Sequence, residues 1–354
     1  MSNPVNVHRT LAEATRATRS RVGAARPRRA AASRVVLVAL LACASVVPAL
    51  VAPTPARADS TTRIVVSFPP GGPVDIVART LAEQLGKELG TRVIVENKAG
   101  ANGAIGADAV ARAEPDGGTL WITSVGAAAI NPSLYPKLAY DMKKDFAPVS
   151  LVVNNVEVMV VRPDRSPADV KAMLAAAKSS GKPLTLASSG VGSIPHFVME
   201  QLADASGAPI THVPYKGAAP AITDVMGGQV DAFFGDVPGL IGHIRGKRLK
   251  PVALAADKRH PLLPDVPTLG ELGMPGIDSD NWYALFVPAK TDPAVIEKLN
   301  AAVRRSIADP SINAKLAATG AEPKSSTPRE LAALLERDTA KWKKLIESKG
   351  ITAQ

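Results

Sequence analysis

Four short loops rich in glycine, serine and proline stand where predicted strands end and predicted helices begin. They comprise residues 69–72, 124–127, 188–193 and 215–217. Small side chains let backbone N–H groups approach a ligand, and a helix N-terminus carries partial positive charge. Each loop taken alone is explained by ordinary turn chemistry. The four together predict a shared cleft that binds a carboxylate or a phosphate through backbone donors.

The side chains that usually perform catalysis are scarce in this chain. The single cysteine, Cys43, lies near the N-terminus, and the histidines beyond it do not pair at metal-binding spacing. Only His196 stands out, because it follows the loop at 188–193, but no acidic residue is expected to orient it. The sequence contains no P-loop, no Gly-x-Ser-x-Gly elbow and no His-Glu-x-x-His. We therefore expect no enzyme, no catalytic residue, no metal and no cofactor.

Gly100, Gly103 and Gly106 superficially resemble a dinucleotide-binding fingerprint. Their spacing is G-x-x-G-x-x-G, and the first glycine comes late after the preceding strand. We interpret this segment as a turn followed by a closely packed helix.

Residues 1–58 have the composition of an export signal. They contain nine arginines and one acidic residue, then an uncharged stretch from Val35, and they end in Ala56-Arg57-Ala58. This order predicts a signal peptide that is cleaved after Ala58, with the remaining chain in the periplasm. A retained membrane anchor, which needs ~20 apolar residues, and a lipoprotein acylated at Cys43 are the alternatives.

The net charge of +10 comes mostly from this leader. Its nine arginines and Glu13 contribute +8, which leaves +2 for the rest of the chain. The alkaline composition is therefore no argument for nucleic-acid binding.

Short β-type runs alternate with amphipathic helical runs after the leader, which predicts an α/β protein with parallel, doubly wound sheets. The β-rich stretch at 146–161 is too long for one ordinary strand, so it is either two strands or one strand that crosses between lobes. We expect two lobes joined by two crossings, with residues 59–158 and 282–354 in the first and residues 159–281 in the second. The predicted strands are residues 63–68, 92–96, 119–123, 184–187, 210–213, 230–234, 251–255 and 282–287, and the predicted helices include residues 104–113, 167–179, 194–205, 219–226 and 240–245.

Many of these segments resemble one known family, the Bug-type substrate-binding receptors of tripartite tricarboxylate transporters. The opening run at 63–79, Arg-Ile-Val-Val-Ser-Phe-Pro-Pro-Gly-Gly-Pro-Val-Asp-Ile-Val-Ala-Arg, is the longest such segment. The resemblance extends in order over residues 62–350. Its other segments are residues 95–103, 114–117, 130–135, 145–149, 188–193, 213–220, 227–231 and 263–268.

The resemblance implies a type II periplasmic-binding-protein fold that closes over a small carboxylate, held largely by backbone groups and water. It implies delivery of that ligand to the membrane subunits of a tripartite tricarboxylate-type transporter, by a monomer without a nucleic-acid partner. The alternative is a periplasmic sensor that feeds a membrane kinase. By position, the ligand-binding residues implied are Phe68, Pro70, Gly71, Gly72, Asp75, Ser124, Gly126, Ala128, Ser188, Ser189, Gly190, Gly192, Ser193, His196, Tyr215, Lys216, Gly217 and Asp236.

The chain departs from the family pattern at two places. Pro73 and Val74 replace a glycine and a threonine, and Ala127 and Ala128 replace polar residues. These changes suggest a less polar ligand end, such as that of an aromatic or aliphatic carboxylate. For Asp75 we expect an indirect role or a favourable charge at the helix N-terminus, because an ionised Asp75 would repel a ligand carboxylate.

Overall fold

The computed structural model describes residues 61–277 and 279–352 of the 354-residue chain. The predicted signal peptide, its cleavage after Ala58 and the possible acylation of Cys43 lie outside the described residues. Within the described part, no helix is both long and apolar enough to span a bilayer.

The first of two sheets has six strands in the order β11-β4-β10-β3-β1-β2. The strands β1, β2 and β3 are parallel, whereas β10 runs antiparallel to both β3 and β4. The expected parallel arrangement is therefore present for β1, β2 and β3, and the prediction is wrong for β4, β10 and β11. The bounds are β1 (Thr61–Val66), β2 (Arg92–Asn97), β3 (Thr119–Ser124), β4 (Phe146–Asn155), β10 (Asn281–Pro288) and β11 (Glu322–Pro323).

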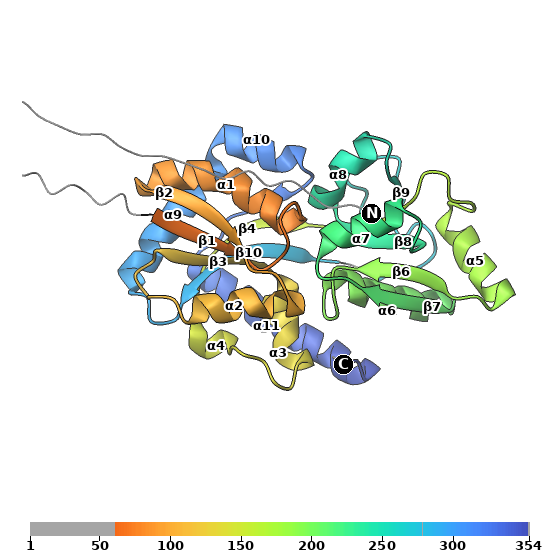
Figure 1. The fold of residues 1–354 in the computed structure, drawn as a ribbon, viewed down its shortest axis with the longest axis horizontal. Coiled ribbons are helices and arrows are strands. Elements are labelled where there is room, and N and C mark those ends of the chain that lie inside the picture. Colours follow the sequence, from red (N-terminus) through yellow and green to blue (C-terminus); the bar gives the residue numbers. More distant parts are fainter. Residues whose placement is uncertain (1–60, 278, 353–354) are drawn as a thin grey trace, which may run out of the picture. The chain divides into compact units, whose positions relative to one another are not determined.

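Helices cover both faces of this sheet (Figure 1). Successive side chains of a strand point to opposite faces, so Ile64 and Val66 pack with α1, α9 and α10, whereas Val65 packs with α2 and α11. The helix bounds are α1 (Pro73–Leu89), α2 (Ala104–Ala111), α9 (Pro293–Ala308), α10 (Pro310–Ala318) and α11 (Pro328–Lys349), and the short helices are α3 (Asn131–Leu134) and α4 (Met142–Asp145).

The second sheet has five strands in the order β7-β6-β8-β5-β9. Here β6 is parallel to β7 and β8, and β5 is antiparallel to β8 and β9. Helices α5 and α6 pack on one face, and α7 and α8 on the other. The bounds are β5 (Glu157–Val161), β6 (Leu184–Ser188), β7 (Ile210–Pro214), β8 (Ala232–Asp236), β9 (Lys250–Ala255), α5 (Val170–Ser180), α6 (Ile194–Ser206), α7 (Ala218–Met226) and α8 (Val237–Arg245).

The chain passes from the first sheet to the second across one residue, Val156, which separates β4 from β5. It has returned to the first sheet at Asn281, which pairs with Asn155. The stretch at 146–161 is thus two strands in two sheets. The division into lobes stays a prediction; the sheets place Glu157 with the second lobe and Asn281 with the first, each on the other side of the expected boundary.

Candidate ligand-binding site

A cavity of about 190 Å³ lies among loops that belong to both sheets. Four of these loops follow β1, β2, β6 and β7, at the carboxyl ends of parallel strands, where ligands usually bind in α/β proteins. The volume is below the usual ~300–1,000 Å³ of pockets for drug-sized molecules, so it suits a small ligand. The lining residues are Phe68, Gly100, Ala101, Asn102, Gly103, Tyr135, Ser189, Gly190, Val191, Pro214, Tyr215, Lys216 and Gly217.

Only some of the residues expected from the sequence line this cavity. Six of them do: Phe68, Ser189, Gly190, Tyr215, Lys216 and Gly217. The others lie in neighbouring loops or in the interior. These are Pro70, Gly71, Gly72, Asp75, Ser124, Gly126, Ala128, Ser188, Gly192, Ser193, His196 and Asp236.

Lys216, an exposed residue, is the one lysine or arginine among the lining residues, and none of them is acidic. The next residue, Gly217, is the N-cap of α7, with φ 112°, and no side chain caps this helix. A helix N-terminus attracts anions because its first N–H groups have no partner within the helix. A lysine and the N-cap of a helix are therefore consecutive residues at this edge of the cavity.

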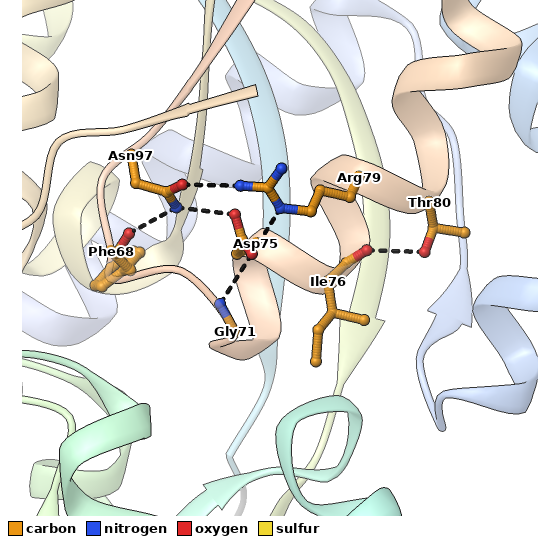
Figure 2. A network of polar contacts seen from close by, with 7 residues as sticks. All are labelled: Phe68, Gly71, Asp75, Ile76, Arg79, Thr80 and Asn97. Carbon is orange, nitrogen blue, oxygen red and sulfur yellow. Dashed lines mark hydrogen bonds and ion pairs between the residues drawn. The ribbon is translucent and has the colours of Figure 1, made fainter. Parts of the chain in front are cut away.

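The loop after β1 is held by a network around Asp75 (Figure 2). Asp75 Oδ2 accepts hydrogen bonds from Gly71 N and Arg79 Nε, each at 2.9 Å, and Oδ1 accepts one from Asn97 Nδ2 at 2.8 Å. Asn97 Nδ2 also donates to the carbonyl oxygen of Phe68 at 3.0 Å. Asp75 is buried, and both of its carboxylate oxygens accept hydrogen bonds. Its geometry therefore gives it an indirect role, that of holding the loop that carries Phe68, which lines the cavity.

This loop offers almost no backbone donors for a carboxylate. Pro69, Pro70 and Pro73 have no N–H group. The N–H of Gly71 is bound to Asp75, and that of Gly72 points to Pro69 O at 3.4 Å. A carboxylate held by backbone donors of residues 69–73 is therefore incompatible with this arrangement.

The loop after β6 also uses several of its own donors. Gly190 N donates to Ser188 Oγ at 3.1 Å, Gly192 N to His196 Nδ1 at 3.2 Å, and Ser193 N to Gly190 O at 3.1 Å. These bonds fix the wall of the cavity at Ser189 and Gly190. Gly217 N is engaged as well, by Ser189 O at 3.0 Å, so at α7 the donors for an anion would be the first N–H groups inside the helix rather than that of its N-cap.

His196 has an acidic neighbour that the sequence interpretation missed. Its Nε2 lies 3.5 Å from Glu200 Oε1, one helical turn further along α6. The ring stacks on His212 with centroids 4.1 Å apart, and His212 Nε2 lies 2.6 Å from Ser188 Oγ. Burial lowers the pKa of His212 to about 4. Because the Ser188 side chain is fully buried, this cluster presents no accessible nucleophile.

The sequence interpretation also missed the lining segment at 100–103. All four residues have positive φ, including Ala101 at 46° and Asn102 at 45°, a conformation that non-glycine residues rarely adopt. The side chain of Asn102 donates to Asn131 Oδ1 at 2.9 Å, and Asn131 Nδ2 donates back to Asn102 O at 3.0 Å. The two glycines indicated a turn, but only the fold shows that this turn faces the cavity. Tyr135, which was also missed, donates to Val191 O at 3.1 Å across the two sets of loops.

The residues that depart from the family pattern do not line the cavity. Ala127 and Ala128 are fully buried, and Pro73 and Val74 are also buried at the start of α1. None of the four lines the cavity. They therefore give no support for a less polar ligand end. The polarity of the cavity walls is set by the lining residues, such as Phe68.

Two α/β sheets that the chain crosses between twice, with a cavity among their loops, are the architecture of the periplasmic solute-binding proteins. The chain belongs to one family within this class, the tripartite tricarboxylate transporter family receptors, whose model matches residues 77–351. The resemblance to Bug-type receptors and the expected fold class are thus confirmed.

Two curated relatives illustrate this membership. The protein in the tcbD–tcbE intergenic region of Pseudomonas sp. strain P51 is 37% identical over 80% of this chain and 84% of its own length. Protein BugT of Bordetella pertussis is 35% identical over 81% of this chain and 89% of its own length.

Three solved structures agree in fold. The periplasmic binding protein BugD is 34% identical with a TM-score of 0.79, covering 83% of this chain and 99% of its own. MatC of Rhodopseudomonas palustris, solved with bound malate, is 33% identical with a TM-score of 0.76, over 81% and 98%. A second R. palustris protein, solved with adipate, is 30% identical with a TM-score of 0.79, over 82% and 98%.

Proposed function

We propose that this protein captures a small carboxylate in the cavity between its two sheets and delivers it, without chemical change, to a tripartite tricarboxylate-type membrane transporter. It would act in the periplasm as a monomer, after cleavage following Ala58. The observation that carries the proposal is that Lys216 and Gly217, the N-cap of α7, both line this cavity, and that no side chain caps this helix.

The lining chemistry fits an anion with a carbon skeleton. One ammonium group and one helix N-terminus attract negative charge, and no lining carboxylate opposes it. Phe68, Tyr135 and Val191, which carry large apolar or aromatic side chains, line the same space. The relatives solved with malate and with adipate support a carboxylate ligand.

Calorimetric titration tests the proposal with malate, adipate, citrate, glutamate and terephthalate, after mass spectrometry of any ligand that copurifies. We expect at least one carboxylate to bind, and the Lys216→Met variant to bind it about tenfold or more weakly. A hydrogen bond to a charged group contributes ~1.5–3 kcal/mol. The control is Lys171→Met, which removes an exposed lysine of α5.

Binding of no carboxylate by the wild type would refute capture, and equal losses in both variants would refute the role of Lys216. Delivery is tested separately, because deleting the gene should abolish uptake of the bound carboxylate by the cell. Turnover of the ligand in the titration would overturn the proposal of capture without chemistry.

A further inference from the structure

Two carboxyl groups are buried together where the chain passes between the two sheets. Glu157 is the first residue of β5, Asp236 is the last residue of β8, and the two are direct partners in the antiparallel ladder. Glu157 is 0% exposed and Asp236 is 7% exposed. Neither lines the ligand cavity, so the proposed function does not use them.

The two groups share donors that come from the other sheet. Asn281 Nδ2 donates to Glu157 Oε1 at 3.2 Å and to Asp236 Oδ1 at 2.8 Å, so these two oxygens are separated by at most the sum of those distances, about 6 Å. The hydroxyl of Tyr283 donates to Asp236 Oδ2. Both Asn281 and Tyr283 belong to β10 of the first sheet. The pair therefore sits in the joint between the sheets.

No positive charge faces this pair among the described residues. The titratable groups that face it are Tyr283 from β10 and the two carboxyl groups themselves, from β5 and β8. The neighbouring strand β9 presents Ala255, and the returning crossing presents Ser279, whose hydroxyl accepts from Glu157 N. Two adjacent buried carboxylates without a cation are strongly unfavourable, because burial and like charge both oppose ionisation.

One oxygen atom of the pair, Glu157 Oε2, is fully buried and has no hydrogen-bond donor among the described residues. A buried acceptor without a donor is costly. A proton placed between the two carboxyl groups removes one negative charge and converts one of them into a donor for the other.

We propose that Glu157 and Asp236 form a proton-binding site in the joint between the two sheets, where a single proton is shared by both carboxyl groups at neutral pH. Pairs of closely spaced carboxyl groups share one proton in this way in other proteins. The site is distinct from the ligand cavity, and its existence does not depend on the proposed function.

The site makes stability depend on pH with a definite sign. Burial raises the pKa of Glu157 well above its ordinary 4.5 and that of Asp236 from 3.8 to about 7. The folded chain thus keeps a proton that the unfolded chain has lost. The stabilisation is complete below the unfolded pKa values and disappears as the pH rises through the folded ones. Between the unfolded and the folded pKa values, this site should increase the unfolding equilibrium constant about tenfold per pH unit.

The Glu157→Gln variant tests this directly on the full chain, because an amide in place of the carboxyl group mimics its protonated form. Two measurements are made: urea unfolding from about pH 5 to about pH 9, and the infrared C=O band of a protonated carboxyl group near neutral pH. The wild type should show the band. Its unfolding equilibrium constant, relative to that of the variant, should increase by up to tenfold per pH unit. The variant should lack the band. The Asp236→Asn variant should behave in the same way.

Asp338→Asn is the matched control, since Asp338 is also buried but accepts bonds from Trp282 Nε1 and Arg337 Nε at 2.7 and 3.1 Å. It should keep the band and the wild-type pH dependence. Absence of the band in the wild type overturns the proposal even if the variants fail to fold. So does a band that survives both substitutions, or a pH dependence equal in the wild type and Glu157→Gln.

Discussion

The carboxylate of Asp75 is buried and still ionised, because three partners surround it. Burial raises its pKa, but the hydrogen bonds from Arg79, Gly71 and Asn97 outweigh that effect and hold the pKa below its ordinary 3.8. The bonds run to the loop after β1 and to the end of β2. Asp75 thus links two strand ends beside the cavity.

We predict that Asp75→Asn loosens this loop and weakens carboxylate binding, with a stability loss of about 1 kcal/mol near neutral pH. The loss is modest because the Arg79 side chain is 51% exposed and solvent screens the pair. Since the folded pKa is lowered, the stabilisation is present above pH 3.8 and disappears as the pH falls through the folded value. Urea unfolding between about pH 6 and about pH 2 measures this difference.

The control for this prediction is Asp108→Asn, which removes the exposed ion pair of Asp108 with Arg112 on α2. It should change neither ligand affinity nor the acid branch of the stability curve. If Asp75→Asn binds ligand as tightly as this control does, the loop-holding role of Asp75 is wrong.

The sequence predicted individual site residues unevenly, for physical reasons. Lys216 and Gly217 were recognisable because a strand, a short loop and a helix follow one another there. Asp236 was expected to face the ligand, but hydrogen bonds from Asn281 and Tyr283 hold it inside the joint. These two residues lie 45 and 47 positions further along the chain, and no local pattern encodes such contacts. The ligand-binding role of every candidate stays a prediction.

At the scale of elements, the N-terminus of α1 lies against α8, a helix of the other sheet. A Cβ atom added to Gly239 would lie 3.0 Å from Pro73 Cδ, whereas one added to Gly242 in the same helix would meet nothing within 4 Å. Glycine at position 239 therefore lets the two helices approach closely, beside the loops that line the cavity.

We predict opposite effects for alanine at these two positions. Gly242→Ala should stabilise the protein by ~0.5–1 kcal/mol, because alanine is the better helix former. Gly239→Ala should gain the same helix propensity but lose ~1–3 kcal/mol to overpacking, and it should weaken ligand binding by pushing α1 and α8 apart. Thermal unfolding and calorimetry compare the two. Equal stability and affinity in both variants would show that the close approach has no consequence.

Most elements were predictable because apolar periodicity is a local property. The buried runs of β1, β3, β6, β8 and β10 and the amphipathic stripe of α1 have clear signatures. The direction of β10 and β4 was not predictable, since alternation does not distinguish a parallel strand from an antiparallel one. The two-residue β11 and the helix α10 were missed because they are too short or too weakly amphipathic to stand out.

At the scale of the whole molecule, ligand binding and proton binding share the same two sheets. Asp236 belongs to the second sheet, and its donors Asn281 and Tyr283 belong to the first. A ligand that changes how the sheets meet would alter these hydrogen bonds, and with them the affinity of the pair for its proton.

We therefore predict that carboxylate binding near neutral pH is accompanied by proton exchange with the solvent. The binding enthalpy of the wild type should depend on the ionisation enthalpy of the buffer, and that of Glu157→Gln should depend on it less. Titrations in phosphate and in Tris measure the effect. The same buffer dependence in both proteins would show that the two sites are uncoupled.

The pairing of Asn155 with Asn281 has a consequence for how such a chain can evolve. Because the chain leaves the first sheet and re-enters it at neighbouring positions, the segment between them is an insertion with adjoining ends. Two crossovers, one near each end, could exchange that segment between related genes without changing the path of the rest of the chain. The exchange would replace the cavity wall that carries Lys216 and keep the wall that carries Phe68. A new ligand specificity could thus arise by recombination of two existing halves, before any point mutation refines it.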